Sequence, residues 1–229
     1  MEKSKIIEKL FEHINTYAYL ILPVLFFLTK TKKRDGKILA IYGVVFCSLL
    51  FFYYYIPKQF IKTAYQPLYT FLEYFFFAII YYNNTENRKF KRIIVGLSAL
   101  FFMFQILYVL FIEKGRVDSV VIGVESILIF IYIILFFFEN LNNTKGINIY
   151  SNHCFWISIG LLFYLGGSFF LNILANTLSD EDFKKYWFLN FIADTIKTLL
   201  FAIGLLILAY KTKKKTIHNP TSVPNLEMI

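Results

Sequence analysis

Residues 119–138 read SVVIGVESILIFIYIILFFF, a run of twenty in which a single side chain, Glu125, is charged. A helix needs about 20 mostly apolar residues to cross the hydrocarbon core of a bilayer. A transmembrane barrel strand would alternate apolar and polar side chains over about 10 residues, and this run does not alternate. Residues 119–138 therefore predict a membrane-spanning helix.

Six more apolar runs lie along the chain. They are residues 14–28, 38–56, 66–82, 93–112, 154–175 and 188–210. Of the 229 residues, 58% are hydrophobic, 21% are aromatic and only 17% are charged, whereas soluble domains are nearer about 25% charged. A water-soluble globule of this size could not bury so many apolar residues, which excludes soluble enzymes and nucleic-acid-binding proteins. The sequence predicts an all-α membrane protein with seven transmembrane helices.

The chain divides into three regions. Residues 1–13 are too charged to span a bilayer, but their apolar side chains share one helical face, which predicts an amphipathic segment in the membrane interface. Residues 14–210 form the seven-helix bundle. Residues 211–229 begin basic and continue polar with two prolines, so we expect a disordered cytoplasmic tail.

The distribution of lysine and arginine predicts the orientation. The formal net charge is +9, and 24 basic residues contribute to it. The set of connections that includes the carboxyl-terminal tail holds 14 of them, and the alternate set holds nine. Because short basic loops stay in the cytoplasm, we expect the amino terminus outside and the carboxyl terminus inside. The basic rim suits anionic lipid or a separate signalling protein, and nucleic acid is not an expected partner.

Ionisable side chains inside the predicted spans are candidates for a functional site, because they are costly in hydrocarbon. There are four: Glu73, Glu125, Asp194 and Lys197. Each lies five to nine residues from the outer end of its span, or roughly 8–14 Å at 1.5 Å per residue. Gln105, on an antiparallel span, lies at a comparable depth. Independent placement does not explain this alignment, so we expect these side chains to meet at one level.

Further polar residues share helical faces with the charged ones. Tyr69 lies four residues before Glu73, Asn190 lies four before Asp194, and Tyr164 belongs to a polar stripe on the sixth run. Stripes that face one another would enclose an acidic cavity in the outer half of the bundle, open to the outside. The predicted ligand-binding residues are Glu73, Glu125, Asp194, Lys197, Tyr69, Gln105, Tyr164 and Asn190.

The charges of this constellation do not cancel. Asp194 and Lys197 are three residues apart on one helix and can pair, which leaves Glu73 and Glu125 as an uncompensated pair. Either a carboxyl group there is protonated, or the cavity holds a cation or cationic ligand. A structural role is the alternative, since polar side chains hold membrane helices together by about 0.6–2 kcal/mol each.

Catalytic motifs are absent from the sequence. The three histidines lie outside the predicted spans, and there is no phosphate-binding glycine loop and no nucleophile elbow. We therefore expect no enzyme activity, no catalytic residue, no metal and no cofactor. Lys197 in the seventh span raises retinal binding as an alternative, with Lys197 as the Schiff base. Its spacing of three from Asp194 differs from the four familiar in microbial rhodopsins.

Four segments carry a resemblance to a known family: Leu72-Glu73, residues 116–126, residues 155–164 and residues 187–204. Together they resemble an uncharacterised bacterial family of seven-helix integral membrane proteins, over most of the chain from the third span onward. The resemblance implies a location in the bacterial inner membrane and a gene often encoded beside two-component signalling proteins. It implies no activity.

Three functions fit this sequence. In the first, a sensor or receptor-like module binds a small ligand, cation or proton in the cavity and signals to a separate partner. In the second, a small transporter or ion- or proton-conducting protein uses the same carboxylates as a relay. In the third, the bundle is a scaffold of a membrane complex. The first is favoured, because the sequence shows no convincing internal repeat of the kind that transporters carry.

Overall fold

The computed structural model describes residues 2–53, 55–57, 60, 64–111, 119–142, 149–174 and 177–218. Within these ranges the chain is helical and contains no strand. The elements are α1 (Glu2–Ala18), α2 (Ile21–Thr29), α3 (Arg34–Tyr53), α5 (Gln66–Asn84), α6 (Arg88–Phe111), α7 (Ser119–Asn142), η2 (Ile149–Ser151), α8 (His153–Leu174), α9 (Asp180–Tyr186) and α10 (Phe188–His218). The prediction of an all-α protein is confirmed for the described part of the chain.

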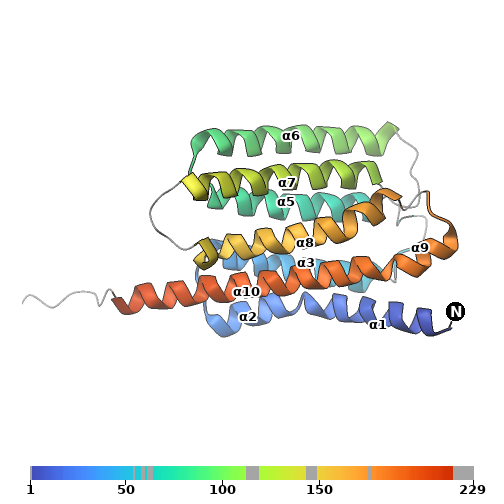
Figure 1. The fold of residues 1–229 in the computed structure, drawn as a ribbon, viewed down its shortest axis with the longest axis horizontal. Helices are drawn as coiled ribbons and strands as arrows, with labels where there is room; N and C mark the ends of the chain where they lie inside the picture. The colour runs from blue at the N-terminus through green and yellow to red at the C-terminus, as the bar shows by residue number, and fades with distance from the viewer. Residues whose placement is uncertain are drawn as a thin grey trace, which may run out of the picture.

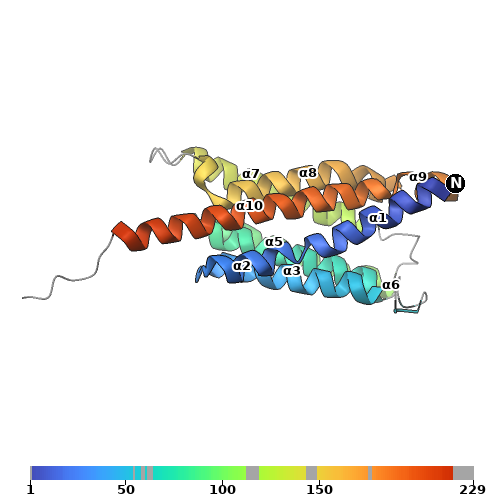
Figure 2. The same ribbon diagram turned by 90° about the horizontal axis from the view of Figure 1, so that it is seen from below.

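The long helices form one up-and-down bundle (Figure 1). Helices that follow each other in the chain pack side by side, from α2 on α3 through α7 on α8 and α8 on α10. The last helix, α10, also packs on α1 and α2, as Figure 2 shows from below, and this contact closes the bundle into a ring. Residues at the two ends of the sequence therefore meet inside the bundle.

Six helical segments of the described chain are long and apolar enough to cross a membrane. They are Lys9–Thr29, Arg34–Tyr53, Arg88–Phe111, Ser119–Asn142, His153–Asn172 and Glu181–Lys213. Large apolar side chains such as Phe27, Leu110 and Leu141 are exposed on their outward faces, as expected for surface that meets lipid. The length and composition of these helices support a multi-pass membrane protein.

The third predicted span, residues 66–82, is not among these six and corresponds to α5, which is 19 residues long. It is less apolar than the six because it carries buried polar residues, among them Thr70 and Glu73. Helices α3, α6 and α7 all pack against it. The bundle therefore contains seven long helical segments, and α5 contributes buried polar residues to its interior.

The first segment is broken between α1 and α2. We expected an interfacial helix over residues 1–13, but α1 continues to Ala18 and its Phe11 packs on Phe188 of α10, with ring centroids 6.0 Å apart. Helix α3 lies close to the break, since a Cβ on Gly43 would come within 2.5 Å of the Tyr19 carbonyl oxygen. This approach is open only to glycine. The placement of residues 1–13 in the membrane interface stays a prediction.

Helix α10 is the longest element, with 31 residues or about 46 Å at 1.5 Å per residue. It extends past the bundle at the end opposite the amino terminus (Figure 1). The region expected to be a disordered tail from residue 211 is therefore helical to His218, and residues 219–229 lie outside the described residues. Lysines near a helix carboxyl terminus interact favourably with the helix dipole, which suits this extension.

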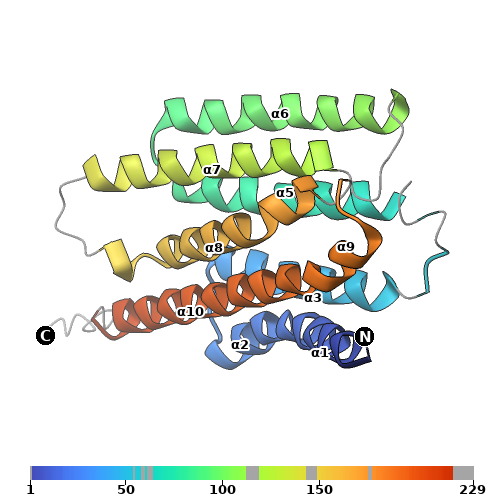
Figure 3. The ribbon, with the colours of Figure 1, turned by 45° about the vertical axis from the view of Figure 1, so that its right-hand side comes forward.

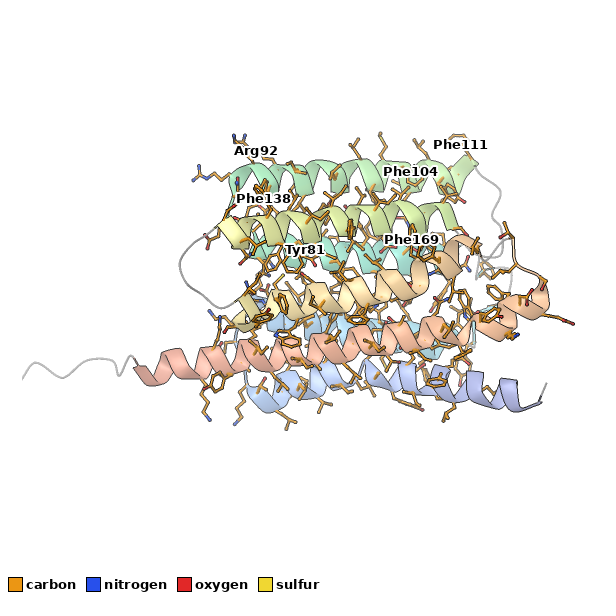
Figure 4. All side chains as sticks on the ribbon, in the orientation of Figure 1. Tyr81, Arg92, Phe104, Phe111, Phe138 and Phe169 are labelled. Atoms are coloured by element: carbon orange, nitrogen blue, oxygen red, sulfur yellow. The ribbon has the colours of Figure 1, made fainter. Side chains whose placement is uncertain are left out.

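Side chains fill the spaces between the helices (Figure 4). At the end of the bundle where α10 extends, Arg92 points away from the helices (Figure 4). Lys211 and Lys213, on the same part of α10, are exposed. The short helix α9 lies at the opposite end, between α8 and α10 (Figure 3). The bundle thus has a basic end and an end covered by α9.

Candidate functional site

The centre of the candidate site is the ammonium group of Lys197 on α10. Its Nζ lies 2.6 Å from Oε1 of Glu73 on α5 and 2.5 Å from Oδ1 of Asp194, one turn earlier on α10. The Lys197 side chain is 0% exposed, and both carboxylates are buried. A fully buried ammonium group is tolerated when it is paired in this way.

This geometry corrects one expectation. Asp194 was expected to neutralise Lys197 and to leave both glutamates uncompensated. Lys197 instead bridges Asp194 and Glu73, because the ring brings α5 and α10 within reach of one side chain. Glu125 is the acid that lies outside this bridge.

The second oxygen of Asp194 is held by the first segment of the chain. Oδ2 of Asp194 accepts hydrogen bonds from the Tyr19 hydroxyl at 2.6 Å and from Nδ2 of Asn15 at 2.9 Å. Sequence reasoning missed Asn15 and Tyr19, because it assigned no polar stripe to the first apolar run, residues 14–28. Their spacing of four residues, which puts both on one helical face, is the signal that could have found them.

The second oxygen of Glu73 is held by α8. The Tyr164 hydroxyl donates to Oε2 of Glu73 at 3.2 Å, and the Tyr164 ring centroid lies 3.9 Å from Nζ of Lys197. The rings of Tyr19, Tyr42 and Phe77 surround the same ammonium group at 5.7–5.9 Å. Aromatic faces attract cations at such distances, so rings and carboxylates together enclose the charge of Lys197.

Close packing of α8 on α10 makes these contacts of Tyr164 available. A Cβ on Gly167 would lie only 2.8 Å from Cβ of Ala193, so the two helices approach closely at this point. Tyr164 lies one turn before Gly167 and is thereby brought against Lys197. Small residues serve this purpose widely in membrane bundles.

A cavity of about 420 Å³ opens beside this network, at the end of the bundle covered by α9. Every long segment except α6 contributes to its wall. Six of the eight predicted site residues line it: Glu73, Glu125, Asp194, Tyr69, Tyr164 and Asn190. Lys197 lies behind its two carboxylate partners and is not among the described lining residues.

Gln105 does not line the cavity. Its Nε2 donates to the carbonyl oxygen of Pro67 at 2.7 Å and ties α6 to the first turn of α5. The contact leaves its side chain buried between two neighbouring helices. Gln105 therefore fastens these helices together, although its depth in the sequence matched that of the acids.

Several polar atoms in the cavity wall have no hydrogen-bond partner among the described residues. They include Oε1 of Glu125, both amide atoms of Asn190 and the hydroxyl of Tyr65, while Oδ1 of Asp194, which also accepts no hydrogen bond, is held by its ion pair with Lys197. Glu125 is only 4% exposed. Because buried polar groups in folded proteins are nearly always bonded, these atoms are available to water or to a molecule in the cavity.

Aromatic side chains complete two walls of the cavity. Tyr53, Tyr65 and Tyr69 form a continuous row, with ring centroids 5.2 and 6.1 Å apart. In a second group, far from these tyrosines in the sequence, the ring of Phe183 on α9 stacks on the ring of Trp187, with centroids 4.6 Å apart. The contribution of α9 was not foreseen, because this short polar helix lies outside the predicted spans.

A second polar cluster lies at the basic end of the bundle. Asp35 on α3 pairs with Nε2 of His153 at 2.9 Å and accepts hydrogen bonds from Asn84 at 2.9 Å and Asn83 at 3.3 Å. These contacts join the first turn of α3 to the last turn of α5 and the first turn of α8. The cluster ties helix ends together.

Comparisons with protein-family models, with curated proteins and with solved structures find no match to this chain. The resemblance to a bacterial seven-helix family therefore stays a prediction. Among the described residues, no group of three or more His, Cys, Asp or Glu side chains could hold a metal ion.

Proposed function

We propose that the protein is a receptor-like membrane module that binds a small ligand in this cavity and signals through α10 to a separate protein. The observation that carries the proposal is the continuity of α10. One helix holds Asp194 and Lys197 at the cavity and exposed Lys211 and Lys213 at the opposite end. Fourteen residues separate Lys197 from Lys211, or about 21 Å along the helix.

We further propose that α5 crosses the membrane together with the six apolar segments, which gives seven spans. The cavity would then lie on the outer side of a bacterial inner membrane. Basic residues gather at the end away from the cavity, in residues 30–37 and 88–92 and on α10. The positive-inside rule makes that end cytoplasmic. The same surface would receive the signalling partner.

The proposed signal is a change in the contact between α5 and α10. A ligand changes a conformational equilibrium only if it binds one state better than the other. A ligand seated beside Glu73 and Asp194 competes with Lys197 for the carboxylates that join the two helices. Release of that bridge lets α10 shift, and shifts of about 1–2 Å are typical of helices that carry signals.

A distance measurement tests this coupling without any ligand. Spin labels at Arg92→Cys and Lys211→Cys, in a background without native cysteines, report the separation of α6 and α10 at the basic end. We expect Glu73→Gln, which weakens the bridge at the cavity, to change the distance distribution. The matched control is Tyr65→Phe, a change in the same cavity that leaves the bridge intact. Identical distributions in all three proteins would reject the proposed coupling.

The alternative functions have their own tests. A transporter predicts proton or ion flux into liposomes that Glu125→Gln abolishes, whereas a receptor shows none. A scaffold predicts that neutralising the acids changes thermal stability and no distance at the basic end. Retinal binding to Lys197 predicts a visible absorption band when retinal is added to the purified protein.

A further inference from the structure

We infer that the cavity takes an organic cation, an amine or quaternary ammonium group on an apolar body, and that Glu125 is its counter-ion. This inference rests on the proposed function, because it names the class of ligand for the same cavity. The cavity wall holds four carboxylates, and three of them, Glu73, Asp194 and Glu125, are buried but differ in their partners.

Two of these acids are already satisfied. Glu73 places one oxygen on Lys197 and the other on the Tyr164 hydroxyl. Asp194 places one oxygen on Lys197 and the other on Tyr19 and Asn15. Three of these four oxygens accept hydrogen bonds, and Oδ1 of Asp194 lies in an ion pair with Lys197.

Glu125 differs from both. Its side chain is only 4% exposed, and its Oε1 has no hydrogen-bond partner among the described residues. The described wall of the cavity contains four carboxylates and no lysine or arginine. A buried carboxylate without a partner is strongly disfavoured, so the chemical complement of a charged Glu125 is a cation that enters from outside, whereas a protonated Glu125 would show no preference for cations in the test below.

The walls favour an organic cation over a metal ion. Calcium takes six to eight oxygen ligands, and no cluster of three metal-binding side chains exists in the described part of the chain. The volume of about 420 Å³ lies within the range of small-molecule sites, and it far exceeds the space of a bare ion. The aromatic rows that include Tyr65 and Trp187 offer ring faces, which attract ammonium groups.

The remaining polar atoms describe the rest of the ligand. Within the described part of the chain, the amide donor and acceptor of Asn190 on α10 and the hydroxyl of Tyr65 have no hydrogen-bond partner. Glu125 lies on α7, so a ligand that reaches all three would join α5, α7 and α10. We therefore expect the apolar body to carry a hydroxyl or amide in addition to its cationic group.

The chain contains its own reporters for a binding experiment. It has two tryptophans, of which Trp187 lines the cavity and Trp156 lies near the start of α8, at the other end of the bundle. In a Trp156→Phe background, tryptophan fluorescence reports the cavity alone. The probes are benzyltrimethylammonium, choline and 3,3-dimethyl-1-butanol, a neutral molecule with the shape of choline.

The protein is measured in phosphatidylglycerol nanodiscs, whose lipid carries no amine. We expect both cations to change Trp187 fluorescence saturably, and the neutral analogue to bind at least about tenfold more weakly than choline. Glu125→Gln should abolish this preference. Glu139→Gln, the same change on the same helix but outside the cavity, should preserve it. In phosphatidylcholine discs, the lipid headgroup can compete with added choline. A weaker apparent affinity for choline there identifies a lipid headgroup as the source of the cation, and an unchanged affinity identifies a free solute.

The inference is overturned if the neutral analogue binds as tightly as choline, if Glu125→Gln retains the preference, or if neither cation binds. Glu125→Asp keeps the charge but shortens the side chain, so reduced affinity with retained preference is expected even if the glutamine variant folds poorly. Failure here leaves the label distances between positions 92 and 211 unaffected. Receptor coupling and ligand class can therefore fail separately.

Discussion

The two polar clusters of the bundle lie at opposite ends and solve different problems. Around Asp35, the carboxylate oxygens find partners on His153, Asn83 and Asn84, and the side chains are partly exposed. Around Lys197, a charged bridge is wholly buried, and an acid-lined cavity with unpartnered atoms lies next to it. The comparison separates polar residues that fasten helices from polar residues that present a surface.

The largest expected effect is the loss of Lys197. Lys197→Met leaves two buried carboxylates facing each other, and breaking a buried ion pair costs about 3–5 kcal/mol. We expect a large fall in the thermal unfolding temperature of the purified protein. Lys211→Met, an exposed site on the same helix, is the control and should change stability by less than about 0.5 kcal/mol.

A triple variant sharpens this test. Lys197→Met combined with Glu73→Gln and Asp194→Asn removes the charges together, and well-packed neutral replacements of buried ion pairs are often neutral in stability. We expect it to recover much of the lost stability. Equal stability of the single variant and the unaltered protein would contradict the bridge.

The next effect concerns the break between α1 and α2, beside Tyr19. Gly43→Ala places a Cβ within 2.5 Å of the Tyr19 carbonyl oxygen and 2.8 Å of Cδ of Pro23. Overpacking of this kind costs about 1–3 kcal/mol, which thermal unfolding can measure. Gly96→Ala on α6 is the control, since nothing lies within 4 Å of its Cβ. A harmless Gly43→Ala would mean that the break does not hold Tyr19 in place.

A smaller effect is expected at the basic end. Asp35→Asn weakens a partly exposed set of hydrogen bonds, worth about 1 kcal/mol. Thermal unfolding should show this loss, whereas Trp187 fluorescence titrations with choline should not change. A change in choline affinity would show that the two clusters are coupled, and would break the division drawn between them.

The smallest effect on stability is expected for Glu125. Glu125→Gln removes a buried carboxylate whose Oε1 has no hydrogen-bond partner among the described residues, so no bond is lost there and stability should stay unchanged or rise. Chemical unfolding in detergent compares it with Glu139→Gln, whose parent carboxylate accepts two backbone N–H bonds at 2.6 and 2.9 Å. Strong destabilisation by Glu125→Gln and not by Glu139→Gln would show that Glu125 holds helices together.

Much of this architecture is local and could be read from the sequence. Long apolar runs predict helices, and helical spacing predicts that Tyr69 shares a face with Glu73. The same reasoning failed for Gln105, because depth along a helix does not fix which neighbour its side chain faces. The bridge from Lys197 to Glu73 was likewise out of reach, since it depends on how the closed bundle places α5 within reach of a lysine side chain on α10.

Sequence reasoning missed two pairs of residues for different reasons. Asn15 and Tyr19 lie inside the first predicted span, residues 14–28, to which no polar stripe was assigned. Phe183 and Trp187 lie in the connection between the last two spans, and a prediction that begins with the spans assigns little to such residues. Asn15, Phe183 and Trp187 line the cavity, and Tyr19 supports it by holding Asp194. They come together because α10 packs against α1 and α2 and so closes the bundle.

Closure of the ring by the last helix also orders the biogenesis of the protein. Glu73 and its partner Lys197 are separated by 124 residues. At about 5–20 residues per second, the ribosome needs roughly 6–25 seconds to reach the lysine after the glutamate has been made. During this interval α5 holds an acid whose counter-charge does not yet exist, so a chain truncated before α10 should be a substrate for membrane proteases.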